Sequence, residues 1–188
     1  IPTSPLVRPA DANETAAAWL EILRRHEGPA GIALTRQNIP VFERGQGTAD
    51  GDVFASTDGV AKGAYVLAEA PNGTPDVIII ATGPEVQLAV DARAALAEEG
   101  VNVRVVSAPS LEWFDEQDEA YRESVLPQAV TARVSVEAGS VLSWRGIVGD
   151  RGRSVGIDHF GASADYKTLF QKFGITTEAV IAAARETI

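Results

Sequence analysis

Short apolar runs alternate along most of this chain with longer segments in which apolar residues recur every three or four positions. The runs are too short for helices and are bounded by glycine, proline or polar residues, so they predict buried strands. The longer segments have the spacing of one buried helix face. The expected strands are residues 65–68, 77–81, 101–106, 131–136 and 154–157, and the expected helices lie within residues 84–99, 111–126, 140–148, 164–173 and 177–187.

Strand and helix alternate from residue 77 to the C-terminus, which predicts the α/β class. We expect a mostly parallel five-stranded sheet with right-handed crossovers, helices on both faces and one antiparallel edge strand. The antiparallel strand is residues 65–68, because the turn cluster at residues 71–75 favours a hairpin with residues 77–81.

A separate helix and strand precede this sheet. Asp11 suits a helix N-cap, and Glu14 three positions later completes a capping-box pattern. The helix ends at Gly28-Pro29, and a strand is expected from residue 31 to Arg36. Because one helix cannot cover both faces of a strand, we interpret this piece as the remnant of a larger domain.

Residues 42–62 are rich in glycine, aspartate, serine and threonine and show little hydrophobic periodicity, so they predict a linker. The expected organisation is a domain remnant over residues 1–41, a linker over 42–62 and a complete domain over 63–188. The chain also lacks methionine and begins at Ile1. These features lead us to expect a fragment of a longer protein.

The composition narrows the classes of partner. The 188 residues carry a net charge of −10, which argues against nucleic acid or an anionic membrane as a partner. No apolar run approaches the ~20 residues that cross a bilayer. The chain has no cysteine, so disulfides and thiolate metal sites are excluded, and a reducing cytoplasm fits this composition.

The most informative polar cluster is Thr35-Arg36-Gln37-Asn38, at the end of the expected strand. Ligands of open α/β sheets bind outside the carboxyl ends of strands, and an arginine fork there suits a phosphate or a carboxylate. The alternative is that Arg36 forms an ordinary surface salt bridge. The pattern alone favours this alternative, because exposed charges usually contribute little.

Three further candidates have simpler structural explanations. Ser140 stands at a strand-to-helix turn but lacks the second glycine of a nucleophile elbow, so we interpret it as an N-cap. His159 follows the last expected strand and could shuttle protons, although we favour a structural role, with Asp158 as a cap or turn residue. His26 is interpreted as a charge at a helix C-terminus.

Two groups of like charges could bind ions. The acidic group could hold Ca²⁺ or Mg²⁺, but it lacks EF-hand spacing, and we interpret it as a solvated, helix-capping face. The basic group could hold an anion, with loop charge pairing as the default interpretation. The acidic residues are Glu112, Asp115, Glu116, Asp118 and Glu119, and the basic residues are Arg145, Arg151 and Arg153.

Several segments together resemble the C-terminal part of transketolases. Thr35-Arg36-Gln37-Asn38 is similar to the end of the pyrimidine-binding domain of that family, and residues 63–188 resemble its C-terminal domain. The resemblance covers essentially the whole chain, and the combination of segments makes it specific. The other matching segments, in family order, are residues 8–15, 78–86, 116–118, 121–127, 133–139, 158–163 and 173–176.

This resemblance implies that Arg36 holds the phosphate of a sugar substrate. The parent enzyme would transfer a two-carbon ketol unit between ketose and aldose phosphates in the pentose phosphate pathway. It would be a cytoplasmic homodimer with thiamine diphosphate and Mg²⁺ or Ca²⁺. The catalytic, cofactor-binding and metal-binding residues of the family belong to upstream segments. We therefore expect none of them here, no cofactor bound to the fragment, and no activity of the fragment alone.

Three alternatives remain open at this point. A 2-oxo-acid dehydrogenase component or deoxyxylulose-phosphate synthase would share the C-terminal fold, although residues 35–38 and 158–163 favour transketolase. The C-terminal domain could act only as a dimerisation and packing module without a ligand. A regulatory effector could bind in the sheet crevice near Ser107, Glu137 and His159, which an open crevice would support and a filled one would not.

Overall fold

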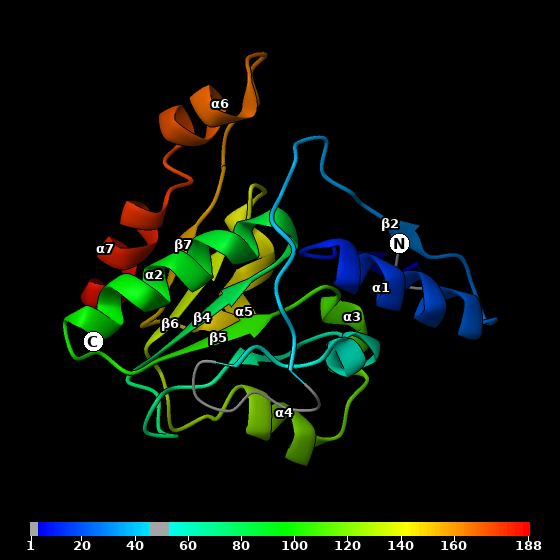
Figure 1. Ribbon diagram of the computed structural model, residues 1–188, viewed down its shortest axis with the longest axis horizontal. Helices are drawn as coiled ribbons and strands as arrows, with labels where there is room; N and C mark the ends of the chain where they lie inside the picture. The colour runs from blue at the N-terminus through cyan, green and yellow to red at the C-terminus, as the bar shows by residue number, and fades with distance from the viewer. Residues whose placement is uncertain (1–3, 46–52) are drawn as a thin grey trace.

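Five strands form the centre of the molecule in the computed structural model, which describes residues 4–45 and 53–188. They are β3 (Tyr65–Ala68), β4 (Val77–Ala81), β5 (Val103–Ser107), β6 (Arg133–Val136) and β7 (Arg153–Val155). Their order across the sheet is β3-β5-β4-β6-β7 (Figure 1). β5, β4, β6 and β7 run parallel, whereas β3 is antiparallel to β5. The predicted α/β sheet, mostly parallel with one antiparallel edge strand, is therefore confirmed.

Helices cover both faces of this sheet, as the alternation predicts (Figure 1). Ile79 of β4 packs into the core on one face, while Ile78 and Ile80 pack into the core on the other. Because both sides of β4 are buried, its sequence is an unbroken apolar run. One face is covered by α2 (Val86–Glu98) and α7 (Thr177–Thr187). The other face is covered by α3 (Leu111–Asp115), α4 (Glu119–Val125) and α5 (Arg145–Val148). A further helix, α6 (Tyr166–Phe173), leads into α7.

The predicted pairing of β3 with β4 is wrong. β3 pairs instead with β5, so that Tyr65 lies opposite Ser107 and Val66 opposite Val106. The physical reason is burial. β4 is apolar on both faces and takes the central position between β5 and β6, which leaves the outer edge of β5 for β3.

The N-terminal segment forms a small unit of its own. β1 (Leu6–Val7) pairs in parallel with β2 (Gly31–Ile32), and α1 (Ala12–Arg24) connects them. The strand predicted to reach Arg36 is therefore too long, because it ends at Ile32. The last ladder bond runs from Ala33 N to Val7 O, and the chain of β1 then turns away toward the five-stranded sheet.

Other element boundaries differ in detail from the expectation. Residues 140–148 form a 3₁₀ turn, η3 (Val141–Trp144), followed by α5, rather than one helix. The expected linker, residues 42–62, contains the 3₁₀ segment η1 (Thr57–Lys62), and its residues 46–52 lie outside the described residues. The domain boundaries at residues 41 and 62 stay a prediction.

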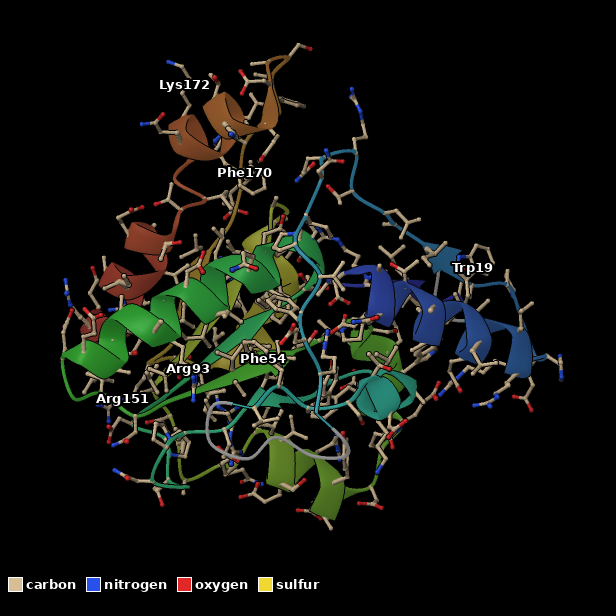
Figure 2. The ribbon with its side chains drawn as sticks, viewed as in Figure 1. Trp19, Phe54, Arg93, Arg151, Phe170 and Lys172 are labelled. Carbon is tan, nitrogen blue, oxygen red and sulfur yellow. The ribbon has the colours of Figure 1, made fainter. Side chains whose placement is uncertain are left out.

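One face of α1 carries large apolar side chains that the described residues leave uncovered. Trp19, Leu20 and Leu23 are about half exposed or more. Figure 2 shows Trp19 on the side of the molecule opposite α6 and α7. Among residues 4–45 and 53–188, no helix is both long and apolar enough to span a membrane.

Candidate functional site

The carboxyl ends of the parallel strands meet at one edge of the sheet, where ligands of such folds bind. Ser107 ends β5, Thr82 follows β4 and Glu137 follows β6. The structure brings Arg8 and Glu14 of the N-terminal segment into contact with these three residues. The chain itself therefore fills the crevice that the sequence predicts at this edge.

Glu14 is the centre of a buried polar cluster at this edge. It lies in the first turn of α1 and is fully buried. Its Oε1 accepts hydrogen bonds from Tyr65 OH and Ser107 Oγ, both at 2.7 Å, and its Oε2 accepts one from Ala10 N at 2.8 Å. Each carboxylate oxygen thus has a donor, which offsets the cost of burying a charge.

Arg44 supplies the positive charge of this cluster. Its Nη2 lies 3.1 Å from Asp11 Oδ2 and 3.6 Å from Glu14 Oε1, and its Nη1 donates to Tyr65 OH at 2.7 Å. Burial is the main reason that the pKa of Tyr65 lies well above its ordinary value, and the charge of Glu14 adds to it. The Tyr65 hydroxyl therefore stays neutral, donating to Glu14 while it accepts from Arg44.

A second cluster surrounds Arg8. Its Nη2 donates to Glu85 Oε2 at 3.0 Å, its Nη1 donates to Glu137 Oε1, and Trp144 Nε1 donates to Glu137 Oε2 at 2.7 Å. Burial raises the pKa of the Glu85 carboxyl, against the opposing attraction of Arg8. A cleft of about 120 Å³ remains beside this cluster, lined in part by Arg8, Thr82, Glu137 and Trp144. The two clusters together join the N-terminal segment to the sheet.

Arg36, the predicted substrate-binding residue, lies outside both clusters. It stands at an exposed bend beyond the end of β2. Its guanidinium has no hydrogen bond or ion pair within the part of the chain that the structure describes. The salt-bridge alternative thus finds no partner among those residues, and the arginine is accessible to an anion. Its role in binding substrate stays a prediction.

His159 contacts neither cluster within the described part of the chain. It is exposed, its Nδ1 lies 2.8 Å from Phe160 O, and its ring packs edge to face against Phe173 with the ring centroids 4.7 Å apart. Ser107 and Glu137, the other residues named for an effector, are bonded to Glu14 and Arg8. The three residues therefore do not form a common open site.

Ser140 and Asp158 act as caps, as predicted. Ser140 Oγ accepts a hydrogen bond from Leu142 N at 3.3 Å, and Asp158 Oδ1 accepts one from Val141 N at 3.0 Å. Both bonds satisfy backbone donors at the start of η3. His26 lies just beyond the last turn of α1, which ends at residue 24.

Several members of the two charged groups form caps or ion pairs with neighbouring residues. Asp118 caps α4, Glu116 Oε2 accepts from Arg25 Nη1 at 2.6 Å, and Arg153 Nε donates to Glu186 Oε2 at 2.9 Å. No cluster of three or more His, Cys, Asp or Glu side chains that could hold a metal ion occurs among residues 4–45 and 53–188. These two groups therefore consist of surface charges and helix-capping charges.

Sequence reasoning missed the residues that fill the crevice. The capping-box pattern marks Glu14, but it predicts a bond to the backbone of Asp11, whereas the side chain bonds Ala10 N and extends to the sheet. No local pattern marks Arg8 or Glu85. Arg8 and Glu137 are 129 positions apart, so only the folded chain brings them together.

Comparison with known sequences identifies the family. Residues 63–176 match the transketolase-like C-terminal domain family. The whole chain is 53% identical to a transketolase of Mycobacterium leprae, of which it covers 26%. It is 48% identical over its whole length to a chloroplastic transketolase of Craterostigma plantagineum, of which it covers 34%. The chain thus spans about a quarter to a third of the length of these curated relatives.

Solved structures give the same result for the fold. Transketolase from Leishmania mexicana matches with a TM-score of 0.84 and 39% identity, over 98% of this chain and 25% of that one. An inactive β4 tetramer of a split gene transketolase matches with a TM-score of 0.72 and 26% identity, over 100% of this chain and 58% of that one. With more than half of its residues matched to one domain family, the chain belongs to the transketolase family and carries that family's C-terminal domain.

Proposed function

We propose that this chain is the C-terminal part of a transketolase, an enzyme that transfers a two-carbon ketol unit from a ketose phosphate to an aldose phosphate. The observation that carries the proposal is the match to transketolases over the full length of the chain, at 53% identity for the Mycobacterium leprae protein. Structurally similar transketolases of Pichia stipitis are described with fructose 6-phosphate, sedoheptulose 7-phosphate and xylulose 5-phosphate. These complexes support sugar phosphates as the substrate class.

Within this enzyme, Arg36 binds the phosphate of the sugar. The side chain is exposed and has no partner among the described residues, so an incoming anion need not displace an existing ion pair. A guanidinium offers two parallel donors that match the geometry of phosphate oxygens. The net charge of −10 would repel a sugar phosphate, so such a local cation is needed.

The cofactor belongs to other parts of the parent protein. When bound, thiamine diphosphate supplies the stabilised carbanion that carries the ketol unit. Among residues 4–45 and 53–188, no group of three or more His, Cys, Asp or Glu side chains is placed to hold its Mg²⁺ or Ca²⁺. This part of the enzyme contributes substrate binding and packing instead. We place the parent enzyme in the cytoplasm as a homodimer of the pentose phosphate pathway.

The packing role is supported by the filled crevice. Glu14 and Arg8 occupy the sheet edge where an effector would have to bind, which favours a packing module over a regulatory site. The uncovered apolar face of α1, with Trp19 and Leu23, fits a helix of a larger pyrimidine-binding domain. Residues 1–41 would then be the last piece of that domain, and residues 63–188 the C-terminal domain.

The experiment compares acceptors with and without a phosphate in the full-length enzyme. Arg36→Ala should lower kcat/KM for a phosphorylated aldose by about 10- to 100-fold, because a charge-assisted hydrogen bond contributes roughly 1.5–3 kcal/mol. The unphosphorylated aldose should be affected much less. Arg36→Lys should recover only part of the loss, since an ammonium lacks the planar fork.

Arg151→Ala is the matched control, because this exposed arginine lies in the C-terminal domain and should not change either activity (Figure 2). An equal loss for both acceptors in Arg36→Ala would mean that Arg36 supports the domain rather than the substrate. A full-length protein without ketol transfer in the presence of thiamine diphosphate and Mg²⁺ would overturn the proposal as a whole. The 188-residue chain alone should be inactive, in keeping with the inactive tetramer of the split gene transketolase.

A further inference from the structure

Arg8 is held through both its backbone and its side chain by the edge of the five-stranded sheet. Its backbone N–H donates to Pro109 O at 2.8 Å. Its carbonyl oxygen accepts from Gly83 N at 3.0 Å and from Thr82 Oγ1 at 3.4 Å. These backbone hydrogen bonds hold residue 8 in place independently of its side chain. All three partners follow the carboxyl ends of β4 and β5.

The side chain enters a site built from two carboxylates. Glu85 is 1% exposed and bonds Nη2, while Glu137 bonds Nη1. Glu137 is itself oriented by the buried Trp144, whose Nε1 donates to its other oxygen at 2.7 Å. Two separate carboxylates facing two nitrogens of one planar group is an arrangement that a guanidinium matches and an ammonium does not.

Gly83 completes the site by leaving room for the guanidinium. A Cβ at this position would lie 3.1 Å from Arg8 Nη2 and 3.3 Å from its Cζ, which is closer than ordinary contact. Gly83 also has φ +63°, a conformation that favours glycine. The backbone of Gly83 thus approaches the guanidinium directly, and its amide binds the carbonyl of the same arginine.

We propose that this edge of the C-terminal domain is a guanidinium-binding site that recognises an arginine residue, and that Arg8 fills it to dock the N-terminal segment onto the domain. The ligand class is an alkylguanidinium presented by a peptide backbone. The proposal concerns assembly of the chain and does not depend on ketol transfer. The cleft of about 120 Å³ beside Arg8 and Glu137 gives a small guanidinium a route to the carboxylates once the arginine side chain is removed.

The test is chemical rescue of Arg8→Ala in the 188-residue chain. The variant should unfold at a lower temperature than the wild type, because two carboxylates then face each other without their cation. Ethylguanidinium at concentrations on the order of 50 mM should bind the folded state and restore at least about half of the decrease in the thermal midpoint. Ethylammonium at the same ionic strength should recover much less, and neither cation should raise the midpoint of the wild type.

Arg8→Ala combined with Glu137→Gln is the matched control, because it removes one wall of the site and should abolish the rescue. Equal rescue by ethylammonium, equal rescue of the double variant, or an equal rise in the wild type would each overturn the proposal. Rescue that is selective for ethylguanidinium and lost in the double variant would support it.

A second measurement serves in case Arg8→Ala does not fold. Arg8→Lys keeps a positive charge at the site but replaces the two nitrogens that contact Glu85 and Glu137 by a single ammonium nitrogen. Hydrogen exchange of the Gly83 amide, which donates to the carbonyl of residue 8, should then become at least about 10-fold faster, because docking is weakened. Arg185→Lys, which changes an exposed pair with Glu99, should leave this amide unchanged. Unchanged exchange in Arg8→Lys would overturn the proposal.

Discussion

Replacing Glu14 with glutamine keeps the shape of a fully buried side chain and removes its charge. The carboxylate accepts from Tyr65 OH, Ser107 Oγ and Ala10 N. An amide has one oxygen and one NH₂ group, so at least one of these donors would lose its acceptor. The Arg44 guanidinium, 3.6 Å from Glu14, would also lose part of its countercharge.

We expect Glu14→Gln to lower the free energy of unfolding by about 3 kcal/mol. A hydrogen bond to a charged group contributes roughly 1.5–3 kcal/mol, and a buried donor left unpaired costs about 1–3 kcal/mol. Asp11, 3.1 Å from Arg44, keeps that arginine paired, so the loss should stay at the lower end of the roughly 3–5 kcal/mol for breaking a buried ion pair. The thermal midpoint should fall by about 6–12 °C, at ~2–4 °C per kcal/mol for a chain of this size.

Thermal and urea unfolding of the chain, followed by circular dichroism, measures this loss. Glu27→Gln, at an exposed position beyond α1, is the matched control and should leave the midpoint unchanged. Tyr65→Phe removes one of the donors to the same carboxylate. The free energy of unfolding lost in the double variant Tyr65→Phe, Glu14→Gln should therefore be ~1 kcal/mol smaller than the sum of the losses in the two single variants. A loss below ~1 kcal/mol for Glu14→Gln, or strictly additive losses, would refute the assigned network.

Three further predictions concern pH and the cofactor. Burial raises the pKa of the Glu85 carboxyl, so the folded state binds the carboxyl proton more tightly than the unfolded state does. The stability of the fold therefore decreases as the pH rises from the ordinary pKa of 4.5 through the raised pKa. The wild-type thermal midpoint should therefore fall relative to that of Glu85→Gln as the pH rises from about 4 to 7, and a relative rise would contradict this sign. Burial raises the pKa of Tyr121 to about 12, so Tyr121→Phe should leave the tyrosinate absorbance step near pH 10 unchanged, and loss of that step would disprove the shift. Calorimetric titration of the chain with thiamine diphosphate and Mg²⁺ should give no saturable binding, and micromolar binding would place a cofactor site in these residues.

Features that depend on neighbouring residues are predictable from the sequence. The run Val77–Ala81 predicts a buried strand, and the structure places it at the centre of the sheet with both faces covered. Asp11 caps α1 as predicted, because an N-cap bond reaches only Glu14 N, three residues away. The strand with which β3 pairs is not predictable in this way, because it depends on which sheet edge is left free after the buried strands have packed.

The sequence by itself determined the fold class, the family resemblance and Arg36 as the candidate for binding phosphate. Only the tertiary structure decided that Arg8 and Glu14 fill the crevice of the C-terminal domain. Their partners Glu137 and Ser107 lie 129 and 93 positions away, and separation along the chain says nothing about hydrogen bonds that form only within about 3 Å. Burial of the Glu14 charge is likewise a property of the packed molecule, because a buried charge is stable only where distant segments supply the matching donors and countercharges.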